Sequence, residues 1–233
     1  MRNAPHGGEC TSRAKLAPVK RTPVEPPPCR WDLPPATIAD EHGIVGLGAD
    51  LAPSTVLAAY RSGLFPMRVD RDVLAWWSPD PRGILPVDGM HVSRTLRRAM
   101  GRFDITVNVA FEAVMRECAD PRREHGWIDE SFIEAYARLA DLGWAHSIEA
   151  WQHGQLVGGV YGIRIGALFA GESMFHRVTD ASKVALCAAV ELLRTDGVEL
   201  FDVQWTTPHL QSLGAIDVSR AEYLRRLASV LHE

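Results

Sequence analysis

The sequence predicts an α+β protein with a largely antiparallel sheet, and two observations carry this prediction. Residues 145–175 hold three apolar runs separated by turn signals at His153-Gly154 and Gly166, a pattern typical of an antiparallel meander. A helical, a strand and a second helical pattern then follow in that order to the end of the chain. We expect the last strand, over residues 200–205, to lie next to the meander.

Length and composition allow one large domain or two small ones. Of the 233 residues, 46% are hydrophobic and 23% charged, which is close to the globular average and excludes collagen, coiled coils and wholesale disorder. No apolar run approaches the ~20 residues needed to cross a membrane, and the first residues lack the apolar core of a secretory signal. We therefore expect a soluble, cytoplasmic protein with no membrane partner.

Residues 1–30 differ in composition from the rest of the chain. They hold six prolines, six basic and two acidic residues, so their net charge is +4, whereas residues 31–233 carry −8. A segment with so few large apolar side chains cannot bury enough surface to offset the entropy cost of ordering. We expect residues 1–30 to form a disordered tail and the globular part to begin at Trp31.

Amphipathic patterns that begin at capping residues or end at glycines predict the helices. These helices cover residues 54–63, 91–101, 110–118, 130–142 and 181–195, with Ser54, Ser93 and either Thr179 or Asp180 as expected caps. A last helix begins at the capping box Ser219-Arg220-Ala221-Glu222. Residues 103–107 read as a strand. The proline-containing stretches at residues 64–67 and 76–83 favour loops and turns with embedded aromatic side chains.

Glu172 interrupts an apolar strand pattern over residues 168–175. An unpaired buried carboxylate is costly, so Glu172 needs either structural donors or a ligand. The structural alternative is that it pairs with a nearby cation or with backbone amides.

Asp202 and Gln204 are polar residues in the last predicted strand. Because side chains alternate along a strand, these two share one face, and Phe201, Val203 and Trp205 share the other. A carboxylate beside an amide can orient that amide, or both can hydrogen-bond an amine. The structural alternative is an exposed edge without a function.

Four arginines, Arg94, Arg97, Arg98 and Arg102, follow one side of the helix predicted over residues 91–101. At about 100° per residue they span an arc of about 140°, opposite the apolar side chains of the helix. This pattern favours an ordinary solvated face, and contacts with nucleic-acid phosphates are the functional alternative.

Motifs for metals and nucleotides are absent from the sequence. The four cysteines form no C-x-x-C pair and no zinc-finger spacing, and H-E-x-x-H, Walker A, G-x-G-x-x-G and G-x-S-x-G do not occur. We expect free thiols, no metal, no cofactor and no ATP-dependent reaction.

Several motifs, in order along about residues 31–230, carry a resemblance to a known family. They are Gly46-Leu47-Gly48-Ala49-Asp50-Leu51, Gly63-Leu64-Phe65-Pro66, Trp76-Trp77-Ser78-Pro79-Asp80-Pro81-Arg82, Gly158-Gly159-Val160-Tyr161-Gly162, Gly171-Glu172-Ser173-Met174-Phe175, Ala181-Ser182-Lys183 and Ser212-Leu213-Gly214-Ala215. Together these resemble the leucyl/phenylalanyl-tRNA–protein transferase family, and the third and fifth motifs in combination are specific.

The resemblance implies both an architecture and an activity. It implies a small N-terminal domain over residues 31–82 and, over residues 83–233, a GNAT-like (acyl-CoA N-acetyltransferase-like) catalytic domain with a mixed, mostly antiparallel sheet. The implied reaction moves Leu or Phe, and also Met, from aminoacyl-tRNA to the N-terminal Arg or Lys of acceptor proteins. The new N-terminus marks those proteins for degradation by the N-degron pathway.

The resemblance also implies roles for individual residues. Asp202, Gln204 and Glu172 match the catalytic positions, and the aminoacyl pocket maps to Val160, Phe169, Leu186, Ala189 and Phe201. The tRNA 3′-adenosine is expected at Trp127 and at Met67, where some members have Trp, and the tRNA backbone at Arg94, Arg97, Arg98 and Arg102. We predict that Asp202 orients Gln204, that Gln204 holds the attacking amine, and that Glu172 holds the aminoacyl amino group or the ribose.

Three other functions stay open on the sequence. An acyl-CoA-dependent N-acetyltransferase would need a Q/R-x-x-G-x-G/A loop for the pyrophosphate, and residues 155–160 fail its last position and fall in a predicted hairpin. A peptidoglycan-type aminoacyl transferase would use the same tRNA donor. A non-catalytic tRNA-binding module would need the arginines but not Asp202.

Overall fold

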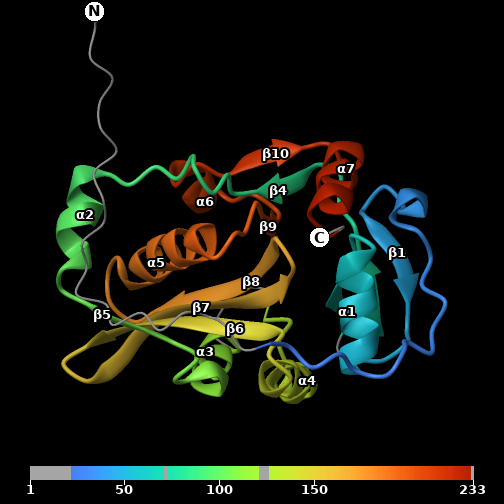
Figure 1. The fold of residues 1–233 in the computed structure, drawn as a ribbon, viewed down its shortest axis with the longest axis horizontal. Helices are drawn as coiled ribbons and strands as arrows, with labels where there is room; N and C mark the ends of the chain where they lie inside the picture. Colours follow the sequence, from blue (N-terminus) through green and yellow to red (C-terminus); the bar gives the residue numbers. More distant parts are fainter. Residues whose placement is uncertain (1–21, 71–72, 121–125, 232–233) are drawn as a thin grey trace, which may run out of the picture.

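Two sheets organise the chain in the computed structural model, which describes residues 22–70, 73–120 and 126–231 (Figure 1). The smaller sheet has the strand order β1-β3-β2, with β1 at Ile44–Leu47, β2 at Phe65–Asp70 and β3 at Val73–Trp77. The larger sheet has the order β10-β4-β9-β8-β7-β6-β5. Its strands are β4 (Arg82–Ile84), β5 (Asp104–Val107), β6 (Ala145–Gln152), β7 (Gln155–Ile165), β8 (Leu168–His176), β9 (Leu200–Gln204) and β10 (Ile216–Val218).

The larger sheet is mixed and mostly antiparallel, as the sequence predicts. Strands β6, β7 and β8 form the expected meander, and β9 pairs parallel to β8. The chain reaches β9 through α5 (Ala181–Thr195), which covers one face of the sheet. The expectation that the last predicted strand lies next to the meander is therefore confirmed.

Helices cover both faces of the larger sheet (Figure 1). One core cluster lies between the sheet and α5 with α2 (Arg94–Met100), and the other lies beneath α3 (Phe111–Cys118) and α4 (Glu130–Asp141) and continues into the smaller sheet. The remaining helices are α1 (Pro53–Arg61), α6 (Pro208–Ser212), α7 (Arg220–Leu231) and a 3₁₀ turn at Ala36–Ile38. The protein is thus an α+β fold with a small N-terminal domain.

The expectation of loops at residues 64–67 and 76–83 is wrong at several positions, because β2 begins at Phe65, β3 ends at Trp77 and β4 begins at Arg82. Proline suggested a break in regular structure, but β2 is an edge strand of the smaller sheet, where a missing N–H breaks no ladder. The aromatic side chains of this stretch supply the buried surface: Trp76 is 1% and Phe65 3% exposed.

The predicted caps are correct in one case and wrong in another. Ser93 accepts a hydrogen bond from Leu96 N at 3.1 Å and caps α2 as expected. Ser54 does not cap α1: the helix begins after Ala52 with Pro53 in its first turn, where the fixed φ of proline favours a helix start. Asp180 takes the cap position of α5 without a side-chain cap bond.

Residues 22–30 do not behave as the expected disordered tail. Val24 N donates to Leu142 O at 2.8 Å, Trp144 Nε1 donates to Val24 O at 2.9 Å, and Glu25 pairs with Arg61 at 2.7 Å. Backbone and charge partners on the body thus compensate for the lack of apolar side chains. Residues 1–21 of the expected tail lie outside the described residues.

Candidate active site

Asp202 lies fully buried on an internal strand of the larger sheet, β9, between β4 and β8. Its carboxylate forms a two-pronged ion pair with Arg82, with Nε to Oδ1 at 2.9 Å and Nη2 to Oδ2 at 2.6 Å. Tyr223 Oη donates to Oδ2 at 2.9 Å. The exposed edge that was the structural alternative is therefore excluded.

Gln204 shares the face of Asp202, as the alternation predicts, but the two are linked differently from the expectation. The backbone N of Gln204 donates to Asp202 Oδ1 at 2.9 Å. The expected contact between the carboxylate and the side-chain amide is not among the hydrogen bonds of Asp202. Asp202 thus acts on the backbone of Gln204, and the amide is left to face another partner.

That partner is Glu172 on β8, whose Oε1 lies 3.3 Å from Gln204 Nε2. Tyr136 Oη donates to Glu172 Oε2 at 3.2 Å and lies 2.9 Å from Tyr60 Oη. In the structural alternative, Glu172 would pair with a cation. These hydrogen bonds do not include one, because both partners of Glu172, Gln204 and Tyr136, are neutral.

The surroundings of Glu172 favour its protonated form. Burial raises the pKa of Glu172 to about 8, and the negative charge of Asp202 adds to the rise, while hydrogen bonds from Tyr60 and Tyr136 and the positive charge of Arg82 oppose it. Burial and the nearby Glu172 in turn raise the pKa values of both tyrosines well above their usual range. Both hydroxyls therefore stay protonated and available as donors.

The Gln204 amide fits its surroundings in a second orientation as well. With the amide turned over, its nitrogen donates to Gly171 O at 3.0 Å and to Val203 O at 3.1 Å. Its carbonyl oxygen then faces Glu172, which can donate a hydrogen bond only when protonated. The orientation of the amide and the protonation state of Glu172 are thus coupled.

The five side chains expected to form the aminoacyl pocket all lie in the core cluster beneath α5. They are Val160, Phe169, Leu186, Ala189 and Phe201, and none is more than 3% exposed. The rings of Phe169 and Phe201 meet edge to face at 5.0 Å. A hydrophobic cluster thus begins on the strands that carry Glu172 and Asp202.

Trp205 departs from the expected alternation. The sequence predicts it on the face of Phe201 and Val203, but it contacts Phe65 at 5.1 Å and Trp77 at 5.8 Å between ring centroids. The reason is the backbone of Gln204, where β9 ends and φ is +58°. Trp205 remains 38% exposed beside the site.

The two residues expected at the tRNA 3′-adenosine are half-buried at the edge of the core cluster beneath α3 and α4. Trp127 precedes α4 and meets Phe132 edge to face at 5.1 Å. Met67 lies on β2, and its carbonyl oxygen accepts a hydrogen bond from Trp77 Nε1 at 3.1 Å. Both pack against that cluster.

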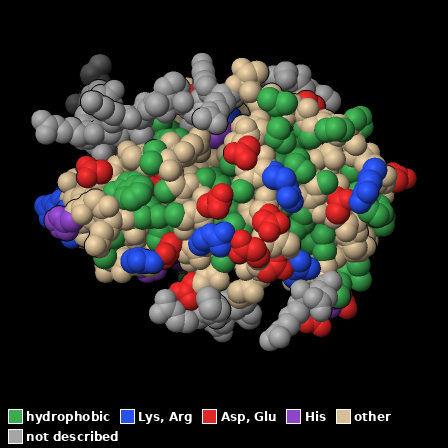
Figure 2. All heavy atoms as spheres, turned by 90° about the horizontal axis from the view of Figure 1, so that it is seen from below, with side chains coloured by type: hydrophobic (Ala, Val, Ile, Leu, Met, Phe, Trp, Pro, Cys, Tyr) green, Lys and Arg blue, Asp and Glu red, His purple; other side chains and the backbone are tan. Residues whose placement is uncertain are grey.

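The four arginines of the α2 region are all exposed, as the helical pattern predicts, while Leu96 and Met100 are buried. Arg102 also pairs with Asp180 at 3.5 Å. Acidic and basic side chains are mixed on the face that carries α3 and α4 (Figure 2), where Arg116 pairs with Glu130.

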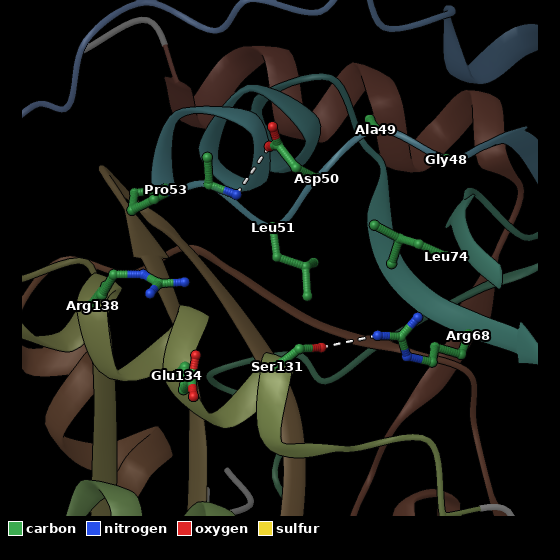
Figure 3. A pocket seen from close by; sticks show the side chains of 11 residues that line it. Gly48, Ala49, Asp50, Leu51, Pro53, Arg68, Leu74, Ser131, Glu134 and Arg138 are labelled. Atoms are coloured by element: carbon green, nitrogen blue, oxygen red, sulfur yellow. Dashed lines mark hydrogen bonds between the residues drawn. The ribbon is translucent and has the colours of Figure 1, made fainter. Parts of the chain in front are cut away.

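A separate cavity of about 560 Å³ lies between residues 48–53, the smaller sheet and α4 (Figure 3). Arg68 donates to Ser131 Oγ at 2.9 Å across one side, and Glu134 and Arg138 extend from α4. None of the three expected catalytic residues lines this cavity.

Sequence reasoning missed the residues that surround Glu172 and Asp202. Arg82 ends the Trp-Trp-Ser-Pro-Asp-Pro-Arg motif, which was the available signal. Tyr60, Tyr136 and Tyr223 carried no signal, because a tyrosine on the apolar side of a helix resembles any core residue. Across residues 22–70, 73–120 and 126–231, no group of three His, Cys, Asp or Glu side chains could hold a metal ion, and no helix is long and apolar enough to span a membrane.

Comparisons with known proteins agree along nearly the whole chain. A family model described as leucyl/phenylalanyl-tRNA protein transferase matches residues 84–228, and a model of its N-terminal domain matches residues 49–80. Curated proteins named leucyl/phenylalanyl-tRNA–protein transferase are similar to this chain. One from Stutzerimonas stutzeri is 46% identical over 90% of this chain and 92% of its own, and one from Anaeromyxobacter dehalogenans is 44% identical over 93% of each.

Among solved structures, the L-PGS structure from Bacillus licheniformis shows only a distant likeness. It covers 62% of this chain and 48% of its own, with a TM-score of 0.39 and 10% sequence identity.

Proposed function

Because the chain belongs to the leucyl/phenylalanyl-tRNA–protein transferase family, we propose that it transfers Leu or Phe, and also Met, from aminoacyl-tRNA to the N-terminal Arg or Lys of acceptor proteins. The observation that carries the proposal is the contact between Gln204 and Glu172, 3.3 Å apart, beside the apolar cluster of Phe169 and Phe201. The modified proteins would then enter the N-degron pathway in the cytoplasm.

The chemistry needs positioning more than activation. The aminoacyl ester is already activated, so the acceptor α-amine forms the C–N bond, the ester C–O bond breaks, and the proton lost by the amine ends on the ribose hydroxyl. Positioning alone can contribute about 7–11 kcal/mol to such a step. The buried amide of Gln204 suits the amine, and Glu172 suits the aminoacyl amino group or the ribose.

The apolar cluster beneath α5 supports a broad preference for apolar side chains. Val160, Phe169, Leu186, Ala189 and Phe201 offer no polar atom beyond the backbone. A pocket of this kind discriminates a methylene by only about 1–3 kcal/mol, so Leu, Phe and Met should all be accepted.

We further propose that the tRNA contacts Trp127 and Met67 through its 3′-adenosine and the arginine face of the α2 region through its phosphates. Half-buried rings and thioethers suit a base, and exposed guanidinium groups suit phosphates.

The parallel β8–β9 pair, joined by α5 within an otherwise antiparallel neighbourhood, supports a GNAT-like class for residues 83–233. Residues 31–82 form the small N-terminal domain in this division. An acyl-CoA donor is less well supported, because residues 155–160 lie inside β7 rather than at a helix start, where backbone N–H groups could hold a pyrophosphate.

The direct test combines purified protein, radiolabelled Leu-tRNA and a peptide that begins with Arg. We expect label in this peptide and none in a matched peptide that begins with Asp. Transfer to both peptides, or to neither, would contradict the proposed acceptor. Saturable binding of acetyl-CoA would favour the acetyltransferase instead.

Reversing two charges on the arginine face should weaken tRNA binding without slowing the chemistry. For Arg97→Glu with Arg98→Glu we expect kcat near its original value, a KM for aminoacyl-tRNA raised about tenfold, and a salt slope of binding reduced by about two. Steady-state kinetics at several salt concentrations measure all three quantities.

The matched control is Arg194→Glu, which reverses an exposed charge near the other end of α5, about 20 Å along that helix from Asp180. We expect this control to keep the original KM. An unchanged KM in the double variant would remove the arginine face from the tRNA site.

A further inference from the structure

Gln204 has a backbone conformation that glutamine seldom adopts. Its φ is +58°, and Trp205 N donates to Val203 O at 2.7 Å, which closes a three-residue turn centred on Gln204. Turns of this kind at positive φ are rare and strained. Such strain persists only where surrounding contacts hold the chain in place.

Asp202 holds this turn from within the sheet. Its Oδ1 accepts from the backbone N of Gln204 and from Arg82 Nε, both at 2.9 Å. Its Oδ2 accepts from Arg82 Nη2 at 2.6 Å and from Tyr223 Oη at 2.9 Å. Four donors occupy the acceptor positions of the carboxylate, which leaves no place for a substrate.

Arg82 is fixed as firmly as the carboxylate it binds. Its guanidinium lies 4.7 Å from the ring centroid of Phe65 and 4.3 Å from that of Tyr223, and Nη1 donates to Gly63 O at 3.2 Å. Although burial disfavours the charged form, the adjacent Asp202 raises the pKa of Arg82, so the group stays charged.

The strand that carries Arg82, β4, also packs closely against the two residues that follow the turn. A Cβ atom on Gly83 would lie 2.8 Å from both Trp205 C and Thr206 N. The close approach of β4 thus limits where the chain can go after Gln204. The turn is held by Asp202 on one side and by β4 on the other.

We propose that Arg82 and Tyr223 are positioning residues that hold Gln204 in its strained turn through Asp202. The proposal rests on the proposed function, because it assigns their effect to the step in which the Gln204 amide holds the attacking amine. Neither residue needs to touch a reactant. Loss of either contact lets the turn relax and moves the amide away from Glu172, which slows the chemical step more than it weakens binding.

Tyr223→Phe is the test variant, because it keeps the ring over Arg82 and removes only the hydroxyl. We expect kcat to fall about tenfold, equivalent to about 1.4 kcal/mol, with KM for both substrates changed less than about twofold. The backbone N–H of Gln204 should exchange with solvent about tenfold faster, while amides of β7 keep their protection. Hydrogen exchange needs no activity, so it reports even on a slow variant.

Arg82→Lys is the second variant, because lysine keeps the charge but cannot form the two parallel bonds. We expect the same fall in kcat and the same faster exchange at Gln204. Its matched control is Arg164→Lys. Arg164 lies on β7, away from the site, and donates hydrogen bonds to Asp196 at the end of α5. We expect this control to keep the kcat of the unmodified protein.

Two results would overturn the positioning role while leaving the proposed function intact. One is a kcat of Tyr223→Phe equal to that of the unmodified protein, together with unchanged hydrogen exchange at the backbone N–H of Gln204. The other is a loss of activity that only follows the unfolded fraction, with kcat per folded molecule preserved. Absence of transfer by the unmodified protein would instead overturn the proposed function, and the kinetic role of Arg82 and Tyr223 with it.

Discussion

Replacing Asp202 by alanine is expected to lower the free energy of unfolding by about 3–5 kcal/mol and to abolish transfer. The variant leaves the Arg82 guanidinium without its counter-ion in the protein interior, where both side chains are 0% exposed. An unpaired buried charge costs more than the pair contributes, because its desolvation is no longer compensated. Denaturant unfolding, followed by tryptophan fluorescence and by circular dichroism, measures the loss.

A double variant separates stability from function at this position. In Arg82→Met with Asp202→Leu, no charge is left buried, and such replacements of buried ion pairs are often neutral or stabilising. We expect it to recover most of the stability that Asp202→Ala loses while transfer stays absent, because Gln204 still lacks its anchor. Recovered transfer in the double variant would contradict the role of Asp202.

Asp217→Ala serves as the control for removing an acidic side chain near the site. Asp217 accepts a hydrogen bond from Thr206 on the exposed surface at 3.0 Å. Changes at such positions usually stay within about 0.5 kcal/mol. A loss as large as that of Asp202→Ala would show that acidic charge near β9, rather than the buried pair, matters for stability.

The parts of the fold that the sequence predicts well are those with strong periodicity. The meander of β6 to β8 and helices α4 and α5 follow their patterns within one or two residues. Strands β1, β2, β3, β4 and β10 escaped prediction because each is short or interrupted by proline, and their order comes from pairing with distant segments. Local pattern carries little information about such pairing.

In the candidate site, too, the sequence predicts residues that interrupt a local pattern but not contacts between distant residues. Asp202, Gln204 and Glu172 stood out because each is a polar residue within an apolar strand pattern, and the structure brings them together. Arg82 could not be connected to Asp202 from the sequence, because 120 residues separate them. The conformation of Gln204 was equally hidden, since ordinary strand alternation predicts an extended backbone there.

Glu172→Gln is expected to stabilise the protein, and the gain should grow with pH. The pKa of Glu172 is raised from 4.5 to about 8 in the folded protein, chiefly by burial. Below pH 4.5 the carboxyl group is protonated in both the folded and unfolded states. As the pH rises from 4.5 to about 8, the unfolded chain releases this proton while the folded protein retains it, so the original protein loses stability over that window.

Glutamine resembles the protonated acid, can accept from Tyr136 and can donate to the turned-over Gln204 amide, and it never ionises. The stability difference between the variant and the original protein should therefore be near zero below pH 4.5 and reach about 2–4 kcal/mol above pH 8. Transfer above about pH 8 should fall at the same time, because only there does the original protein supply a carboxylate to the aminoacyl amino group. Unfolding in urea at pH 4, 6 and 8.5 gives the stability difference at each pH. The matched control is Glu134→Gln, which changes an exposed glutamate of α4, and its stability difference from the original protein should stay small at each pH. A constant difference between Glu172→Gln and the original protein across this range would mean that the pKa of Glu172 is the same in the folded and unfolded protein, and that at neutral pH the amide of Gln204 has no protonated partner to turn toward.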